Sequence, residues 1–184
     1  MVDTLAPRIT ISGNAIVNVE GATAYRDAGA TATDNYDDAA LLQSRIVTSG
    51  AVNTHSPAGS SYLISYNVND TSGNQARTAY RYVLIIDTTP PVITLLGSPT
   101  IVIEAAVPYT DAGAYANDTL DITAAVVATN NVNIYPTSLP ATFTVVYNAQ
   151  DQAGNSAVSV TRSVTVRDTT PPKIFVVCTI DIDE

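Results

Sequence analysis

The stretch Asp87-Thr88-Thr89-Pro90-Pro91 recurs unchanged at residues 168–172, and a diverged copy, Asp-Thr-Leu-Ala-Pro, occupies residues 3–7. The three copies begin 84 and 81 residues apart. This period is too long for one solenoid unit and fits one small all-β domain. The spacing therefore predicts a tandem array, with repeat 1 over residues 1–86, repeat 2 over residues 87–167, and the linker and first strand of an incomplete third repeat over residues 168–184.

The two complete repeats also match beyond the linker. The motif Tyr-x-Asp-Ala-Gly-Ala begins at Tyr25 and again at Tyr109, and Tyr-Asn-x-x-Asp-x-x-Gly-Asn begins at Tyr66 and again at Tyr147. The first pair is 84 residues apart and the second pair 81, so the second copy lacks three residues between positions 121 and 143. A length difference there marks a surface loop.

Composition and periodicity favour an all-β fold. The chain is 46% hydrophobic, and period-two alternation recurs along residues 62–68 and 81–85, on either side of a turn at residues 70–74. These segments predict a β-hairpin with glycine at a positive φ, and a further strand is expected around residues 44–47. About seven short strands per repeat predict two Ig-like Greek-key β-sandwiches joined by short Pro-rich linkers. The chain has no Trp, so the Cys-Trp-Cys signature is absent.

These motifs, with the terminal Arg-x-Val-x-Val at residues 162–166, resemble the bacterial Ig-like repeat family. That family occurs in tandem on large surface and secreted proteins and is also appended to an insecticidal crystal toxin. The resemblance implies a structural spacer or adhesive module, extracellular or on the cell surface, without catalytic activity. The chain departs from the family at Ala22 and Ala106, which stand where a glycine-rich turn is more usual.

Charge and residue counts exclude several functions. A net charge of −9 with a single lysine argues against binding to nucleic acid or to anionic membranes. No run of 18 apolar residues offers a membrane span. His55 stands beside Ser56, but the second repeat has Tyr135 in that loop, so no catalytic set recurs and we expect no enzyme.

Calcium is the cofactor that the sequence suggests, because hard cations bind several carboxylate oxygens from different loops. In a sandwich with alternating strands, the linker, one acidic loop and the Asp-x-x-Gly-Asn turn meet at one pole. We expect the pole of repeat 2 to face the end of repeat 1 that carries Glu20 and Asp27. Plain turn chemistry is the alternative explanation for these acidic residues. The candidate ligands are Asp3, Asp34, Asp37 and Asp70 in repeat 1 and Asp87, Asp118, Asp121 and Asp151 in repeat 2.

The linker prolines predict a stiff connection, because proline fixes its own φ and restricts the preceding residue. We therefore expect a rod-like stalk whose partners are neighbouring repeats of the same protein. The rival interpretation is a module that binds a host or matrix glycan or protein through loops at one pole. Exposed tyrosines would favour it, and the candidates are Tyr25, Tyr36, Tyr80, Tyr82, Tyr109 and Tyr115.

Residues 173–184 echo the first strand of a repeat without the rest of a domain. The simplest explanation is that the sequence is a piece of a longer array. A second is self-association, in which this strand adds to a neighbouring subunit's sheet and builds a filament. A third is that the strand folds back locally.

Overall fold

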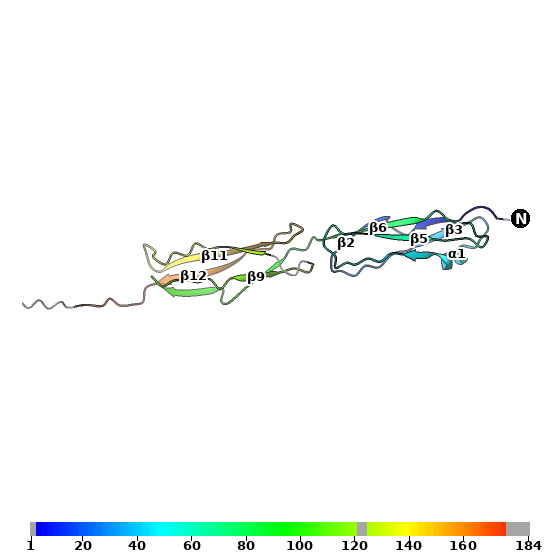
Figure 1. Ribbon diagram of the computed structural model, residues 1–184. Helices are drawn as coiled ribbons and strands as arrows, with labels where there is room; N and C mark the ends of the chain where they lie inside the picture. Colours follow the sequence, from blue (N-terminus) through cyan, green and yellow to red (C-terminus); the bar gives the residue numbers. More distant parts are fainter. Residues whose placement is uncertain (1–2, 121–124, 176–184) are drawn as a thin grey trace, which may run out of the picture.

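The computed structural model describes residues 3–120 and 125–175. These residues form strands that build two sandwiches, placed one after the other along an elongated molecule (Figure 1). Each sandwich combines a two-stranded sheet with a four-stranded sheet. The predicted all-β fold with two tandem sandwiches is confirmed.

The first domain contains six strands among its described residues. Strand β1 pairs antiparallel with β3, and the larger sheet has the order β2-β6-β5-β4, with β2 parallel to β6. Between β1 and β2 the chain changes sheets at Gly13, whose φ is 77°. The strands are β1 (Arg8–Ile11), β2 (Ile16–Glu20), β3 (Ala30–Thr33), β4 (Val47–Ser49), β5 (Ser61–Asn67) and β6 (Ala79–Ile86).

The second domain repeats this topology. Strand β7 pairs with β9, and the larger sheet has the order β10-β11-β12-β8, again with one parallel pair. The register repeats as well, since Ile16 lies opposite Tyr82 and Thr100 lies opposite Ser163. The strands are β7 (Val92–Leu95), β8 (Thr100–Glu104), β9 (Ala114–Asn117), β10 (Ala125–Thr129), β11 (Ala141–Gln150) and β12 (Val160–Arg167).

The strand expected around residues 44–47 is wrong in its first half. Helix α1 (Ala39–Arg45) occupies that position, and β4 begins only at Val47. The carboxylate of Asp38 accepts a hydrogen bond from the Ala40 N–H, which caps the helix, and the following Ala and Leu residues favour helix. Leu42 then buries its whole side chain against Ala32 and Val68 in a small second cluster.

Each sandwich has its own core, built from the alternating positions of the long hairpin. Ile64, Tyr66, Val83 and Ile85 are buried in the first domain, and Val145, Tyr147, Val164 and Val166 take their places in the second. The turn between the hairpin strands has Gly73 at a φ of 90° and Gly154 at 95°. The hairpin prediction is therefore confirmed in both repeats.

Candidate cation site and domain junction

The Asp-x-x-Gly-Asn turn holds the start of each domain. Asp70 is 2% exposed and accepts hydrogen bonds from the backbone N–H and side-chain amide of Asn74, both at 2.7 Å. That amide also donates to the carbonyl of Asp3 at 3.2 Å. In the second domain, Asp151 and Asn155 make the same contacts, and Asn155 donates to the carbonyl of Asp87 at 3.1 Å. Turn chemistry therefore accounts for the repeated Asp and Asn.

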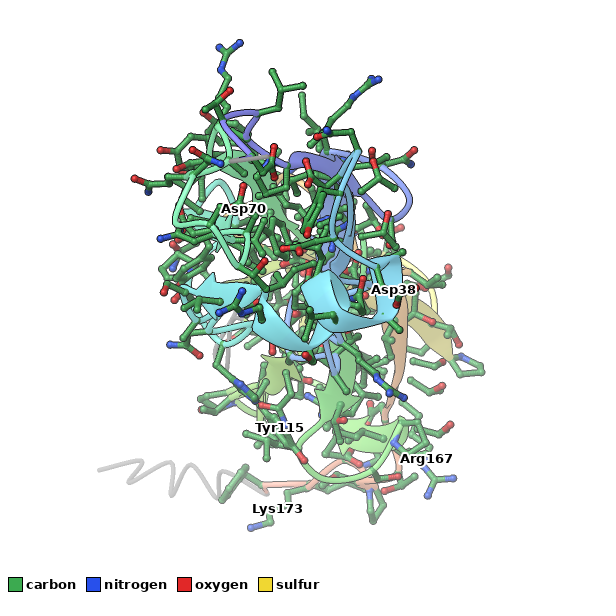
Figure 2. All side chains as sticks on the ribbon, turned by 90° about the vertical axis from the view of Figure 1, so that its right-hand side faces the viewer. Asp38, Asp70, Tyr115, Arg167 and Lys173 are labelled. Carbon is green, nitrogen blue, oxygen red and sulfur yellow. The ribbon has the colours of Figure 1, made fainter. Side chains whose placement is uncertain are left out.

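Carboxylates nevertheless gather at the free pole of the first domain. Asp3, Asp34 and Asp70 each offer one oxygen, and these three oxygens lie within 4.8 Å of one another. Oδ2 of Asp3 is buried and has no hydrogen-bond partner. Asp37 turns to Thr71 instead, accepting from its N–H at 2.6 Å and from its hydroxyl at 2.7 Å. Figure 2 views the molecule from this end, with Asp70 and the helix residue Asp38 labelled.

The equivalent pole of the second domain lies at the junction between the domains. Oδ2 of Asp87 is buried without a hydrogen-bond partner, as in Asp3. Burial raises the pKa of Asp87, and the negative charges of Asp118, Asp151 and Glu20 raise it further. These residues are therefore close enough to Asp87 to repel its charge. The remaining predicted ligand, Asp121, lies outside the described residues.

Two equivalent glutamates, Glu20 and Glu104, fix the linkers, and of these only Glu20 was expected to lie at the facing acidic end. Glu20, at the end of β2, accepts hydrogen bonds from the Thr88 N–H at 2.8 Å, the Thr88 hydroxyl at 2.9 Å and the Thr89 hydroxyl at 3.0 Å. Glu104 makes the same contacts with Thr169 and Thr170. Hydrogen bonds from the Thr169 backbone and hydroxyl contribute most to lowering the pKa of Glu104 to about 2.

The other residue expected at that end, Asp27, lies inside the first domain. It pairs with Arg81, which is 1% exposed, and accepts hydrogen bonds from Tyr66 at 2.6 Å and Tyr25 at 3.0 Å. Nε of Arg81 donates to the carbonyl of Asn14 at 3.0 Å. This network ties β6 to the segment that connects β1 and β2, so it is a structural element rather than a cation site.

The second domain contains the same network. Asp111 pairs with the fully buried Arg162 and accepts from Tyr147 at 2.6 Å and Tyr109 at 2.7 Å. Burial alone would raise the pKa of Asp111, but these hydrogen bonds lower it to about 2. Burial and the Asp111 carboxylate raise the pKa of Tyr147 to about 12. Tyr25 and Tyr109, two candidates for an exposed aromatic cluster, therefore belong to the interior.

The sequence profile described as "Bacterial surface protein, Ig-like domain" matches residues 9–85 and 93–166. The chain belongs to this bacterial surface Ig-like family. The two matched segments correspond to the two sandwiches, so the expected resemblance and the Ig-like fold class are confirmed. Among curated proteins, none matches the chain.

Solved structures similar to this Ig-like pair were also found. One is the lipoprotein BT2262 from Bacteroides thetaiotaomicron, which is 14% identical with a TM-score of 0.38, over 85% of this chain and 98% of that one. Another is the fragment of protocadherin gamma B7 with extracellular cadherin domains 1–4, which is 10% identical with a TM-score of 0.31, over 89% of this chain and 51% of that one.

Family membership identifies the chain as a module of the bacterial surface type, and Ig-like surface domains are generally non-catalytic. In this Ig-like pair, His55 is exposed and the hydroxyl of Ser56 pairs with that of Tyr62. Within residues 3–120 and 125–175, no helix is long and apolar enough to cross a membrane.

Sequence reasoning missed the role of the two buried arginines in these Ig-like domains. Arg81 occupies an inward position in the alternation of β6, between the buried Val83 and the half-buried Ala79. A basic residue in an apolar register needs a carboxylate partner, because an unpaired buried charge is very costly. The repeated Asp27 and Asp111 of the Tyr-x-Asp motif were the available signal.

Proposed function

We propose that this chain is a rigid spacer of a bacterial cell-surface or secreted protein, adhesin-like and without catalytic activity, in which calcium stiffens the array of Ig-like domains. The observation that carries the proposal is the grip on the linker from both sides. Glu20 of the first domain holds Thr88 and Thr89, and Asn155 of the second domain holds the carbonyl of Asp87. Three successive linker residues thus have partners in two different domains.

Further contacts support stiffness at the junction. Pro91 is buried, and each proline fixes its own φ. Leu120 of the second domain lies against Gly21 of the first, so closely that a Cβ at Gly21 would meet its Cδ2 at 2.6 Å. Gly21 in turn donates its N–H to the carbonyl of Ile86 at 2.8 Å, at the end of β6. The side chain of Leu120 therefore packs against the backbone of the first domain, in addition to the contacts of the linker.

Calcium would reinforce this junction. The buried, unpartnered Oδ2 atoms of Asp3 and Asp87 stand at equivalent positions of the two domains. Both lie beside acidic groups, and burying negative charges together destabilises the fold unless a cation neutralises them. Carboxylate oxygens from separate loops are the ligands that Ca²⁺ prefers. Asp3, Asp34 and Asp70 would hold an ion in the first domain, and Asp87, Asp118 and Asp151 in the second.

The test is thermal unfolding in excess EDTA and in millimolar calcium. A ligand that binds only the native state stabilises it by about 2.7 kcal/mol at a hundredfold excess over its dissociation constant, which corresponds to a rise in Tm of roughly 10 °C or more for domains of this size. Asp3→Asn should abolish the rise in the first domain and Asp87→Asn that in the second. Asp168→Asn changes the same motif after β12 and should leave both intact.

A negative result in this test would exclude the role of calcium but would leave the proposed spacer function standing. If Tm does not change between EDTA and calcium, the acidic residues act through turn chemistry alone. The spacer itself depends on the linker contacts, and it would fail if the two domains tumble independently in the unmodified chain.

A further inference from the structure

The outer face of the four-stranded sheet differs between the two domains. In the first domain, Ile16 on β2, Tyr82 on β6 and Leu63 on β5 lie side by side across three strands, because Tyr82 is paired with both of the others. They are 69%, 54% and 46% exposed, respectively. Tyr80, two residues along β6 and therefore on the same face, is 44% exposed. This apolar row, Ile16-Tyr82-Leu63 with Tyr80, is called the tyrosine face below.

The second domain shows that the fold does not require this face. The register is the same, but the equivalent positions are Thr100, Ser163 and Thr144, with Thr161 in place of Tyr80. At the next row only the first strand shows the reverse exchange, with Val102 where the first domain has Asn18, whereas Leu84 on β6 is again replaced by a hydroxyl residue, Thr165. In the second domain, hydroxyl side chains thus occupy the row that Ile16, Tyr82 and Leu63 occupy in the first, and the same sheet still forms. Four exposed apolar groups in the first domain have no structural counterpart, and clustered exposed apolar groups mark interaction sites.

The absence of charged side chains around the tyrosine face limits the class of partner that it can bind. The surface around the tyrosine face is formed by the outward side chains of residues 16–18, 61–67 and 80–84. Among these outward side chains, only the tyrosines are ionisable. The polar neighbours of the tyrosine face are Asn18, Ser61, Ser65 and Asn67. No arginine or lysine occupies these positions, although Arg45 lies beside Asn67, two rows away from Tyr82, and the chain has a net charge of −9. An anionic partner is therefore disfavoured, and a neutral one is not.

The small size of the tyrosine face limits the class of partner further. A stable protein interface takes about 20–30 residues on each side, far more than the few side chains of the tyrosine face. A second copy of the chain would also bring another nine negative charges alongside the first. Two exposed tyrosine rings and two aliphatic side chains, flanked by hydroxyl and amide groups, suit a narrow ligand that has apolar C–H faces and many hydroxyls. Sugar rings have both features.

We propose that the tyrosine face of the first domain binds a neutral polysaccharide chain. The tyrosine rings and the Ile16 and Leu63 side chains would contact the C–H faces of the sugars, and the flanking Ser and Asn groups would hydrogen-bond to their hydroxyls. The proposed binding surface is thus a face of the four-stranded sheet. The rival interpretation of the sequence had instead placed binding in the loops at one pole of a domain. The proposal is independent of the spacer role and of calcium.

Affinity electrophoresis of the whole chain in native gels tests this proposal, with hydroxyethyl cellulose, soluble starch or mannan in the gel and anionic alginate as a comparison. We expect at least one neutral polysaccharide to retard the chain. The double variant Tyr80→Thr/Tyr82→Ser, which installs the residues of the second domain, should bind at least about tenfold more weakly. Tyr36→Ser removes an isolated tyrosine that is 71% exposed and should not alter the retardation.

Three results would overturn the proposal. The first is that none of the three neutral polysaccharides retards the chain. The second is that retardation is unchanged in the double variant while its Tm matches that of the parent. The third is a dimer in sedimentation velocity that the double variant abolishes, which would assign the tyrosine face to a second copy. Conversely, retardation gained when Thr144→Leu, Thr161→Tyr and Ser163→Tyr are introduced into the second domain would support the proposal directly.

Discussion

At the scale of single residues, the buried arginines hold each sandwich together. Arg162 is fully buried, pairs with Asp111, and donates from Nε to the carbonyl of Ser98 at 3.0 Å and from Nη2 to that of Gly113 at 3.2 Å. Replacing it leaves a carboxylate and several carbonyls without donors. We expect Arg162→Met to lower the free energy of unfolding of the second domain by about 3–5 kcal/mol, measured by urea denaturation.

The repeat provides the controls for this variant. Arg81→Met should destabilise the first domain to a similar extent and leave the second unchanged. Arg26→Met replaces an exposed arginine and should change neither domain by more than about 0.5 kcal/mol. A loss below about 1 kcal/mol in Arg162→Met would contradict the assigned role, because it would mean that the buried ion pair is dispensable.

The same network makes stability depend on pH. The pKa of Asp111 is about 2 in the folded domain, against about 3.9 in an unfolded chain. Because the folded value is the lower one, the ionised carboxylate stabilises the domain above pH 4, and this contribution is lost as the pH falls from about 4 to about 2. Linkage puts it at roughly 2–3 kcal/mol. Urea denaturation of the second domain at pH 6, 4 and 2.5 would measure it.

Asp111→Asn is the matched variant for the pH measurement. It should be less stable than the parent at pH 6, and the difference between the two should shrink toward pH 2.5, because Asp111 is protonated in the unfolded chain there and the folded domain must also begin to bind this proton. A constant difference across this range would assign the acid sensitivity of the second domain to its other carboxylates.

At the scale of elements, the end of β2 and the linker act as a unit. Glu20 accepts hydrogen bonds from Thr88 and Thr89, and its pKa is lowered chiefly by the Thr88 backbone N–H. Glu20→Ala removes all these contacts but touches no buried side chain. We expect the two domains to tumble more independently, with little change in the Tm of either. Backbone ¹⁵N relaxation, compared between the domains, would detect this.

Glu104→Ala is the control, because Glu104 makes the same contacts with the linker that follows the second domain. It should not alter the relative motion of the two domains. Equal tumbling of parent and Glu20→Ala would show that Pro90, Pro91 and the contact of Leu120 with Gly21 suffice to hold the junction.

What the sequence could predict about these elements was local or repeated. The alternation in β5 and β6, Gly73 in the turn between them and the linker motif each lie within a few residues, so the hairpins and the tandem order were predictable. Glu20 and Thr88 are 68 residues apart, and Asp27 and Arg81 are 54 apart, so their pairing depends on the sheet order. Helix α1 was missed because its seven residues are too few for a clear period.

The candidate site was predicted to a similar degree. Alternating strand directions sufficed to place Asp3, Asp34 and Asp70 at one pole, and the structure brings these three together. The sequence could not show that the Asp37 side chain would bind Thr71 instead of facing the pole. Asp34 and Asp37 lie in the same acidic loop, and the sequence does not tell which of the two side chains faces the pole. Nor could it distinguish a half-buried Asp3 from an exposed one, since burial there depends on the donor Asn74, 71 residues away.

At the scale of the whole molecule, two nearly identical sandwiches have taken on different surfaces. Their cores, hairpin turns and linker contacts coincide, whereas the tyrosine face belongs to the first domain and the Leu120 contact joins the second to the first. Each domain therefore serves as the internal control for the other. A feature present in both is needed by the fold or the array, whereas an exposed apolar face present in a single domain serves neither the core nor the junction.

The extended shape of the array depends on a short linker that is held by hydrogen bonds from both domains. Inserting Gly-Gly between Pro91 and Val92 would separate the grip of Glu20 from the start of β7 and add two residues without preferred φ values. We expect both domains to keep their Tm, while the average radius of gyration in small-angle X-ray scattering falls, because bent arrangements become populated. The same insertion between Pro172 and Lys173, beyond the second domain, should leave the angle between the domains unchanged. If both insertions give the same scattering curve, the junction is already flexible, and the chain is not a rigid spacer.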